Sequence, residues 1–213
     1  MPYRLLARAA TRATGRLGWG RGAIGALLGI ALAGTLGRAV NGADLPFLIA
    51  PMGAAAVLTF VVPASPLAQP WSVIGGNLLS TLAGLAVHAL LPASPWGGAV
   101  AVALAIAVMS LARCLHPPGG ACALLACLST GPAGLLLGAV CANVAGIVAA
   151  GWLWNNLTGH AWPHHARPVG PPPAYTIDDL DAVLEEWDEV LDVSREDLDA
   201  LFRAVEGRVN ARR

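Results

Sequence analysis

The segment RCLHPPGGACALL, from Arg113 to Leu125, combines residue types that could bind a small ion within an apolar chain. Its Pro-Pro pair lacks backbone N–H groups and its Gly-Gly pair carries no side chains, so we expect the helix to be interrupted between Leu115 and Ala121. Unpaired backbone groups cost several kcal/mol each in hydrocarbon unless they face protein or water. The interruption should therefore line a buried site or a pore.

The same residues are also typical of a helix start, because proline is tolerated in the first turn. Backbone N–H groups and the positive end of the helix dipole at such a start can bind an anion. A second start is expected at Pro51-Met52-Gly53, and two asparagines could supply amide donors. The expected substrate-binding residues are His116, Pro117, Pro118, Gly119, Gly120, Ala121, Cys122, Pro51, Gly53, Asn77 and Asn143.

The two ionisable side chains of this segment have different expected roles. Arg113 lies near the end of an apolar stretch, where its side chain should reach the membrane interface and act as a topology anchor. His116 has two interpretations. It could cap backbone groups that the break frees, or it could take and release a proton during transport, because histidine titrates near neutral pH.

No sequence pattern indicates an enzyme. The chain has no H-E-x-x-H, no G-x-S-x-G, no phosphate-binding Gly-rich loop and no pair of carboxylates in its apolar part. The four cysteines form no C-x-x-C pair, and His160, His164 and His165 lie in a Pro-rich segment that could bind a metal but need not. We expect no cofactor, no metal centre and no nucleic-acid partner.

The composition indicates a membrane protein. Of 213 residues, 56% are hydrophobic and 12% are charged, about half the charge of an ordinary soluble domain. Six arginines and no acid precede Ala39, only Asp44 and Arg113 carry formal charge from there to Ala166, and twelve of the thirteen acids follow Tyr175. The middle of the chain is therefore suited to the lipid bilayer and the two ends to water.

A helix needs about 20 apolar residues to span a bilayer. Five stretches are long enough and a sixth is short: 22–37, 45–62, 72–91, 97–115, 133–154 and, as the short one, 118–130. Six crossings and the arginines before the first stretch place both termini in the cytoplasm. The absence of lysine and the excess of Ala, Gly and Leu suggest a bacterial protein, and hence the inner membrane.

The chain is expected to contain an internal repeat. APMGAAAVL, from Ala50 to Leu58, aligns with PPGGACALL, from Pro117 to Leu125, at a shift of 67 residues, and Asn77 and Asn143 follow at nearly the same shift. Three crossings per unit would invert the second copy relative to the first. The alternative is a chance alignment of two sequences rich in Ala, Gly and Leu.

Four parts are expected along the chain: an Arg-rich cytoplasmic segment (1–21), a transmembrane domain (22–159), a Pro-rich linker (160–174) and an acidic helical hairpin (175–213). The hairpin helices should start at Thr176 and Ser194, which resemble capping residues, and each carries an apolar stripe. This hairpin could be a solvated regulatory tail, or it could bind a cytoplasmic protein or a second copy of the chain. The predicted fold is all-α, a polytopic membrane bundle followed by this hairpin.

At LHPPGGACAL the sequence resembles the HPP family of integral membrane proteins, and the segments APMGAAAVL and SPLAQPW with the following GGN agree. The resemblance covers about Gly22 to Pro168 and is to the bacterial type without CBS domains. It implies a multi-spanning protein, often assigned four helices, and its plant and cyanobacterial members transport nitrite. We therefore expect a transporter or channel for a small anion, nitrite first. The alternative is a non-transporting scaffold or sensor subunit that docks a cytoplasmic partner through the acidic helices.

Overall fold

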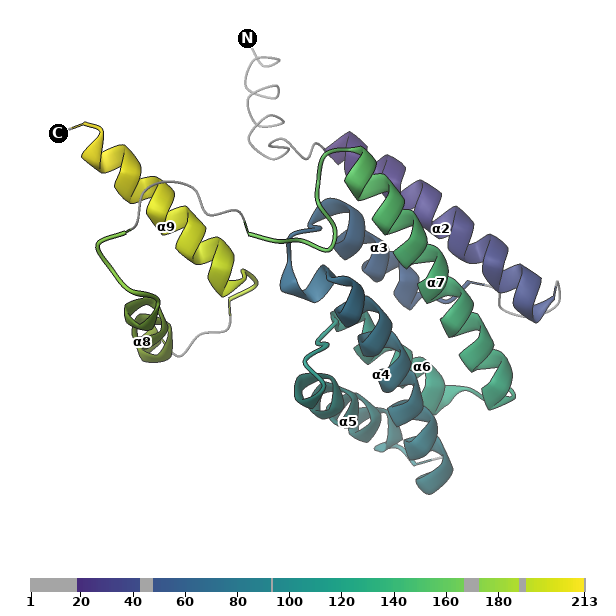
Figure 1. Ribbon diagram of the computed structural model, residues 1–213. Helices are drawn as coiled ribbons and strands as arrows, with labels where there is room; N and C mark the ends of the chain where they lie inside the picture. Colours follow the sequence, from purple (N-terminus) through teal and green to yellow (C-terminus); the bar gives the residue numbers. More distant parts are fainter. Residues whose placement is uncertain (1–18, 43–47, 93, 167–172, 188–190, 213) are drawn as a thin grey trace, which may run out of the picture.

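The computed structural model describes residues 19–42, 48–92, 94–166, 173–187 and 191–212. Within these residues the chain forms helices and no strand, so the predicted all-α fold is confirmed (Figure 1). Most of the Arg-rich N-terminal segment, Asp44 and Arg167 lie outside the described residues. The helices are α2 (Trp19–Asn41), α3 (Pro51–Val61), the 3-10 turn η1 (Pro66–Ala68), α4 (Pro70–Leu90), α5 (Gly97–Leu111), α6 (Pro117–Leu128), α7 (Ala133–Leu157), α8 (Ile177–Trp187) and α9 (Arg195–Asn210).

Three of the described helices, α2, α4 and α7, are long and apolar enough to cross a membrane. By contrast, α3 has 11 residues and α6 has 12. At 1.5 Å per residue each is on the order of 17 Å long, against a hydrocarbon core of about 30 Å. The expected short sixth segment is therefore confirmed in α6, and α3 is a second helix of this kind.

The expectation of a full-length span over 45–62 is wrong, because the helix begins only at Pro51. Proline has no N–H and its ring would clash with a preceding helical turn, so it starts a helix more readily than it continues one. The next repeat shows a similar shortening, since α5 ends at Leu111 and not at Leu115. Arg113 has a φ of 52°, and the N–H of Cys114 donates to Met109 O at 2.9 Å, a geometry that terminates a helix.

One end of the bundle, which we call the terminal end, contains the start of α2 and the end of α7. Arg21 Nε donates to Thr158 Oγ1 at 2.7 Å, and another Arg21 nitrogen donates to Phe60 O at 2.9 Å, which adds the end of α3. Trp162 Nε1, just after α7, donates to Ala68 O at 3.0 Å and so adds the start of α4. The end of α5 lies there too.

The link from α4 to the end of α5 is a hydrogen bond from Trp71 Nε1 to Ala112 O at 3.0 Å. At the opposite end of the bundle, Asn41 Nδ2 donates to Leu135 O at 3.0 Å and joins the end of α2 to the start of α7. His88 Nδ1 bonds Cys127 O at 2.8 Å and joins the ends of α4 and α6.

These contacts establish an inverted repeat of three helices. Helices α2, α3 and α4 correspond in order to α5, α6 and α7, and each member runs in the opposite direction to its counterpart (Figure 1). The packing partners correspond, since α2 packs on α7 and α5 packs on α4, although α6 packs much more extensively on α4 than α3 does on α7. The described helices from α2 to α7 thus alternate in direction, and the end of α7 returns to the end of the bundle where α2 begins.

Small residues allow these helices to approach closely. The buried face of α2 consists of glycine and alanine, and a Cβ on Gly146 of α7 would lie 2.5 Å from Ala33 Cα. Likewise, a Cβ on Gly84 of α4 would lie 2.2 Å from Ala123 O of α6. Such glycine contacts are typical of helix packing in membranes, where dispersion replaces the hydrophobic driving force.

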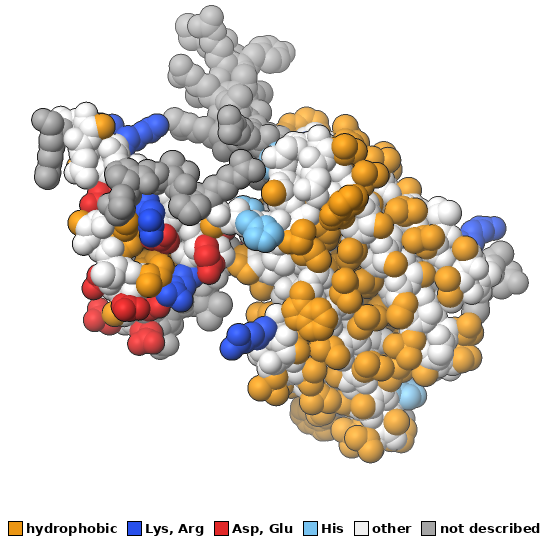
Figure 2. All heavy atoms as spheres, viewed as in Figure 1, with side chains coloured by type: hydrophobic (Ala, Val, Ile, Leu, Met, Phe, Trp, Pro, Cys, Tyr) orange, Lys and Arg blue, Asp and Glu red, His pale blue; other side chains and the backbone are white. Residues whose placement is uncertain are grey.

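The surface divides into an apolar part and a charged part. Hydrophobic side chains cover the face of the bundle seen in Figure 2, whereas acidic and basic side chains gather over α8 and α9. The two capping residues are as expected: Asp179 N donates to Thr176 Oγ1 at 3.3 Å, and Asp197 N donates to Ser194 Oγ at 3.1 Å. Helices α8 and α9, for which we keep the name acidic hairpin, therefore form a polar unit beyond the bundle; they are not among the closely packed pairs of described helices, so the pairing of the two helices stays a prediction.

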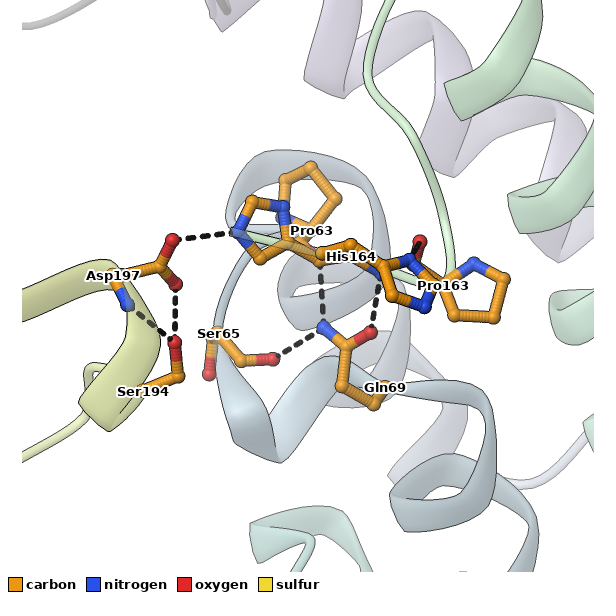
Figure 3. Close-up of polar contacts among 8 residues, drawn as sticks. Pro63, Ser65, Gln69, Pro163, His164, Ser194 and Asp197 are labelled. Carbon is orange, nitrogen blue, oxygen red and sulfur yellow. Dashed lines mark hydrogen bonds and ion pairs between the residues drawn. The ribbon is translucent and has the colours of Figure 1, made fainter. Parts of the chain in front are cut away.

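The hairpin contacts the terminal end of the bundle through few polar groups (Figure 3). His164 Nε2 bonds Asp197 Oδ1 at 2.9 Å, while the backbone N–H of His164 donates to Gln69 Oε1 at 2.8 Å. Ser65 Oγ donates to Asp192 Oδ1 at 2.6 Å. Partial burial would raise the pKa of Asp197, but hydrogen bonds from His164 and Ser194 hold that pKa below its usual range.

Candidate functional site

The interrupted segment begins a helix as predicted. Helix α6 starts at Pro117, and His116 is its N-cap residue with extended backbone angles, φ −147° and ψ 106°. His116, Pro118, Gly119 and Cys122 are buried, and Gly120 is half-buried. Pro117 and Ala121 are exposed on the other side of α6, so the structure does not bring these two predicted site residues toward the bundle interior.

The start of α6 lies against the second turn of α4, well inside the bundle. A Cβ on Gly76 would lie 2.4 Å from His116 Cβ, and a Cβ on Gly119 would lie 2.6 Å from Gly76 O. The same Gly119 position is 2.7 Å from Ser80 Oγ and 2.9 Å from Met109 Sδ. Glycine at 76 and 119 is therefore what lets the two backbones meet at this depth.

The His116 ring has one bonded and one unpaired nitrogen. Nδ1 lies 2.7 Å from Leu67 O, in η1 at the terminal end. The side chain is fully buried, and Nε2 has no hydrogen-bond partner among the described residues. The ring makes no capping bond to α6, so the interpretation of His116 as a side-chain cap is wrong.

The backbone donors at this start are fewer than expected. Of the first four N–H positions of α6, two are prolines without a donor, and Gly119 N donates to His116 O at 2.8 Å. The N–H groups of Ala121 and Cys122 come after the first turn, where helix geometry pairs them with carbonyls four residues back. The expectation that backbone N–H groups at this start are free to bind an anion is therefore wrong for Gly119. Binding of an anion here would depend more on the side chains.

Ser80 is a polar group at this site that the sequence did not single out. Its side chain is fully buried, and Oγ has no hydrogen-bond partner among the described residues. It lies three residues after Asn77 on α4, so the two share one face of the helix. In the sequence, only this spacing from Asn77 could have indicated that Ser80 belongs to the site.

We expect Ser80→Ala to separate stability from function. Because the buried hydroxyl has no partner in the part of the chain that the structure describes, its removal should leave the thermal unfolding midpoint unchanged or raise it. If Ser80 binds the substrate, the same change should slow anion uptake by about tenfold, which corresponds to the loss of about 1.4 kcal/mol of interaction energy. An unchanged uptake rate would contradict a substrate role for Ser80.

The second predicted start is also present, at the beginning of α3. Ile49 N donates to Asn143 Oδ1 at 2.9 Å, and Asn143 Nδ2 donates to Ala33 O at 3.1 Å, so this asparagine of α7 joins α3 to α2. Pro51 is buried, but Gly53 is exposed and faces away from the interior. The N–H groups of Met52 and Gly53 already donate to Ile49 O and Ala50 O.

Asn77 has the matching position in the other repeat. Its Oδ1 accepts from Cys122 Sγ at 3.1 Å, and its Nδ2 donates to Val73 O at 2.8 Å. Each asparagine thus holds the short helix of the opposite repeat, and each amide already donates to a backbone carbonyl. We infer that their first role is to position α3 and α6.

The two starts lie around one core. Helix α3 begins level with Asn143, near the middle of α7, and α6 begins level with Gly76 of α4. Met52 of α3 and Cys122 of α6 belong to the same buried apolar cluster. The structure therefore places Asn77 against Cys122 of α6 and Asn143 against the residues before α3, while the binding of a substrate by the predicted site residues stays a prediction.

Arg113, the expected topology anchor, is exposed between α5 and α6 at the terminal end. That position suits a side chain that reaches the membrane interface. Arg21, which the sequence did not single out, is half-buried and makes more hydrogen bonds than Arg113. Besides Thr158 and Phe60, it donates to Asn155 Oδ1 in the last turns of α7. It therefore ties together three helices whose ends meet at the terminal end.

Arg21→Met should destabilise the protein by about 2 kcal/mol or more, because Phe60 O and Asn155 lose a charged donor in a half-buried place. The measurement is the thermal unfolding midpoint in detergent. Arg38→Met is the matched control, since Arg38 lies in the same helix and is exposed. Equal midpoints for the two variants would show that Arg21 does not link the helices.

An inverted repeat with two short helices that start inside the bundle defines a multi-spanning α-helical membrane protein. The family model described as "HPP, transmembrane region" matches residues 12–163, and the chain belongs to this family. Two transmembrane proteins of Dictyostelium discoideum are 41% and 39% identical to it over 87 residues. Those residues are 39% of this chain but only 30% and 28% of the two relatives, so the chain matches less than a third of their length. No solved structure matches the chain significantly.

Proposed function

We propose that this membrane protein transports or conducts a small monovalent anion, with nitrite as the first candidate. The observation that carries the proposal is the start of α6 at His116, inside a bundle with inverted repeats. In transporters with this architecture, discontinuous helices bind substrate near the membrane midplane. Two unpaired buried groups, Ser80 Oγ and His116 Nε2, border this start and favour a polar ligand there.

Nitrite is suggested by the family resemblance, and its single charge suits the site. A single negative charge benefits from the positive end of the α6 dipole, and a hydroxyl can donate a hydrogen bond to its oxygen. A multiply charged anion would need more counter-charge than the described part of the bundle offers. We further propose that the membrane is a bacterial inner membrane and that the terminal end faces the cytoplasm.

A second candidate function is that of a scaffold or sensor subunit. The observation that favours it is the exposed apolar stripe on α9, formed by Leu201, Phe202, Val205 and Val209. Charged residues surround this stripe, as at many protein docking surfaces. In this case the hairpin, and not the bundle, would carry the function, through a cytoplasmic protein or a second copy of the chain.

One experiment separates the two functions: nitrite uptake into proteoliposomes that contain either the full chain or a chain ending at Pro173. A transporter should keep its uptake without the hairpin, because the α6 start lies in the bundle. A scaffold should give no uptake above protein-free vesicles with either chain. Chloride, nitrate and formate in the same assay would show whether nitrite is preferred.

A further inference from the structure

The hydrogen bond of His116 Nδ1 determines what its other nitrogen can offer. Leu67 O is a carbonyl and can only accept, so Nδ1 must carry the proton in this 2.7 Å contact. In the neutral ring Nε2 is then a bare acceptor. A bare acceptor repels an anion, so neutral His116 cannot help to bind one at the α6 start.

Protonation reverses this effect without disturbing the structure. The imidazolium keeps the Nδ1–H bond to Leu67 and gains a second N–H and a positive charge at Nε2. Nε2 is fully buried and has no partner among the described residues, so a ligand is the available acceptor for that proton. The Ser80 hydroxyl, which lies against Gly119 in the first turn of α6, and the dipole of α6 would add a hydrogen bond and partial positive charge at this helix start.

The groups around His116 provide no fixed counter-charge. On its own segment and on α6 the titratable neighbours are Cys114 and Cys122, both buried thiols, and Arg113, which is exposed. The contacting groups of α4 and η1, Gly76 and Leu67, do not titrate. The sequence from 48 to 166 contains no acid.

Among the described residues, an acid is linked to His116 only indirectly: the ring bonds Leu67 O, and Ser65, two residues before Leu67, donates to Asp192 of the hairpin. A charged His116 would therefore be isolated in a buried, low-dielectric place, which is costly for either partner alone. An anion and a proton that arrive together form a neutral pair and avoid that cost. We propose that His116 couples anion transport to protons: one proton on Nε2 and one monovalent anion at the α6 start bind, move and leave together.

The transport step is balanced, because one proton and one anion leave one side, both appear on the other, and no net charge crosses. This inference rests on the proposed function and names its coupling ion. The test uses the full-length wild-type chain in vesicles with nitrite and a potential clamped by valinomycin and potassium. We expect uptake driven by an inward pH gradient, one proton per nitrite, and no response to the clamped potential. Protein-free vesicles at the same pH are required, because undissociated nitrous acid crosses lipid unaided.

The matched variants are His116→Asn and His88→Asn. Asparagine can replace the Nδ1 donor toward Leu67 but carries no titratable group at the position of Nε2. His88 also bonds a backbone carbonyl through Nδ1, but at the opposite end of the bundle. We expect His116→Asn to lose at least tenfold of the uptake driven by the pH gradient and His88→Asn to keep it.

The outcomes distinguish this inference from the proposed function. Nitrite uptake that follows the clamped potential and ignores the pH gradient would overturn proton coupling and leave anion transport in place. Unchanged coupling in a folded His116→Asn variant would overturn the assignment to His116. No uptake above protein-free vesicles by the wild type would overturn the proposed function itself. If His116→Asn fails to fold, the stoichiometry of the wild type alone decides.

Discussion

Gly119→Leu should abolish nitrite uptake. Even a Cβ at this position would lie 2.6 Å from Gly76 O and 2.7 Å from Ser80 Oγ, and leucine adds three further carbons. The side chain would push the start of α6 away from α4, at the place where the anion is expected to bind. We expect a fall of at least a hundredfold in the initial uptake rate into proteoliposomes.

The control for this variant is Gly134→Leu. Gly134 lies in the first turn of α7, where a Cβ would meet nothing within 4 Å, so leucine should be tolerated there. Gly119→Ala provides a milder test, and it should slow uptake in a protein whose helical content and elution volume match the wild type. Normal uptake by a folded Gly119→Leu variant would contradict the placement of the site at the α6 start.

Asn143→Leu should cause the largest loss of stability in the bundle, about 3 kcal/mol. The substitution leaves Ile49 N–H and Ala33 O without their side-chain partner in a fully buried place, and each such group costs about 1 to 3 kcal/mol. Because Asn143 also fixes the start of α3, uptake should fall together with stability. The measurement is the unfolding midpoint in detergent, followed by the uptake rate at a temperature where the variant stays folded.

Cys141→Leu is the control for Asn143→Leu, since Cys141 lies two residues away on α7 and is exposed. It adds apolar bulk to the same helix without removing a buried hydrogen bond. A midpoint for Asn143→Leu equal to that of Cys141→Leu would show that the α3 start does not depend on this asparagine.

The short helices could be predicted where the chemistry is local. Proline fixes its own backbone and removes a donor, so the helix starts at Pro51 and Pro117 follow from the sequence alone. Counting apolar residues over 45–62 nevertheless predicted a full span, because hydropathy does not register where a helix begins. The shift of 67 residues and three crossings per unit also predicted two repeats of opposite direction, and contacts such as that of Arg21 with Thr158 agree with this prediction.

The details of the site depend on residues far apart in the chain. The unpaired Ser80 hydroxyl matters because Gly119, 39 positions later, packs against it, and no local pattern records this proximity. The loss of a free donor at Gly119 follows from the turn that returns its N–H to His116 O. The partner of the His116 ring, Leu67, lies 49 residues away and decides which nitrogen remains free.

The most direct test of an anion path at the α6 start is the saturable uptake of labelled nitrite by vesicles containing the wild-type chain. We predict an initial rate well above that of protein-free vesicles, suppressed by excess unlabelled nitrite and absent in Gly119→Leu. A rate equal to that of protein-free vesicles, with or without competitor, would contradict the account.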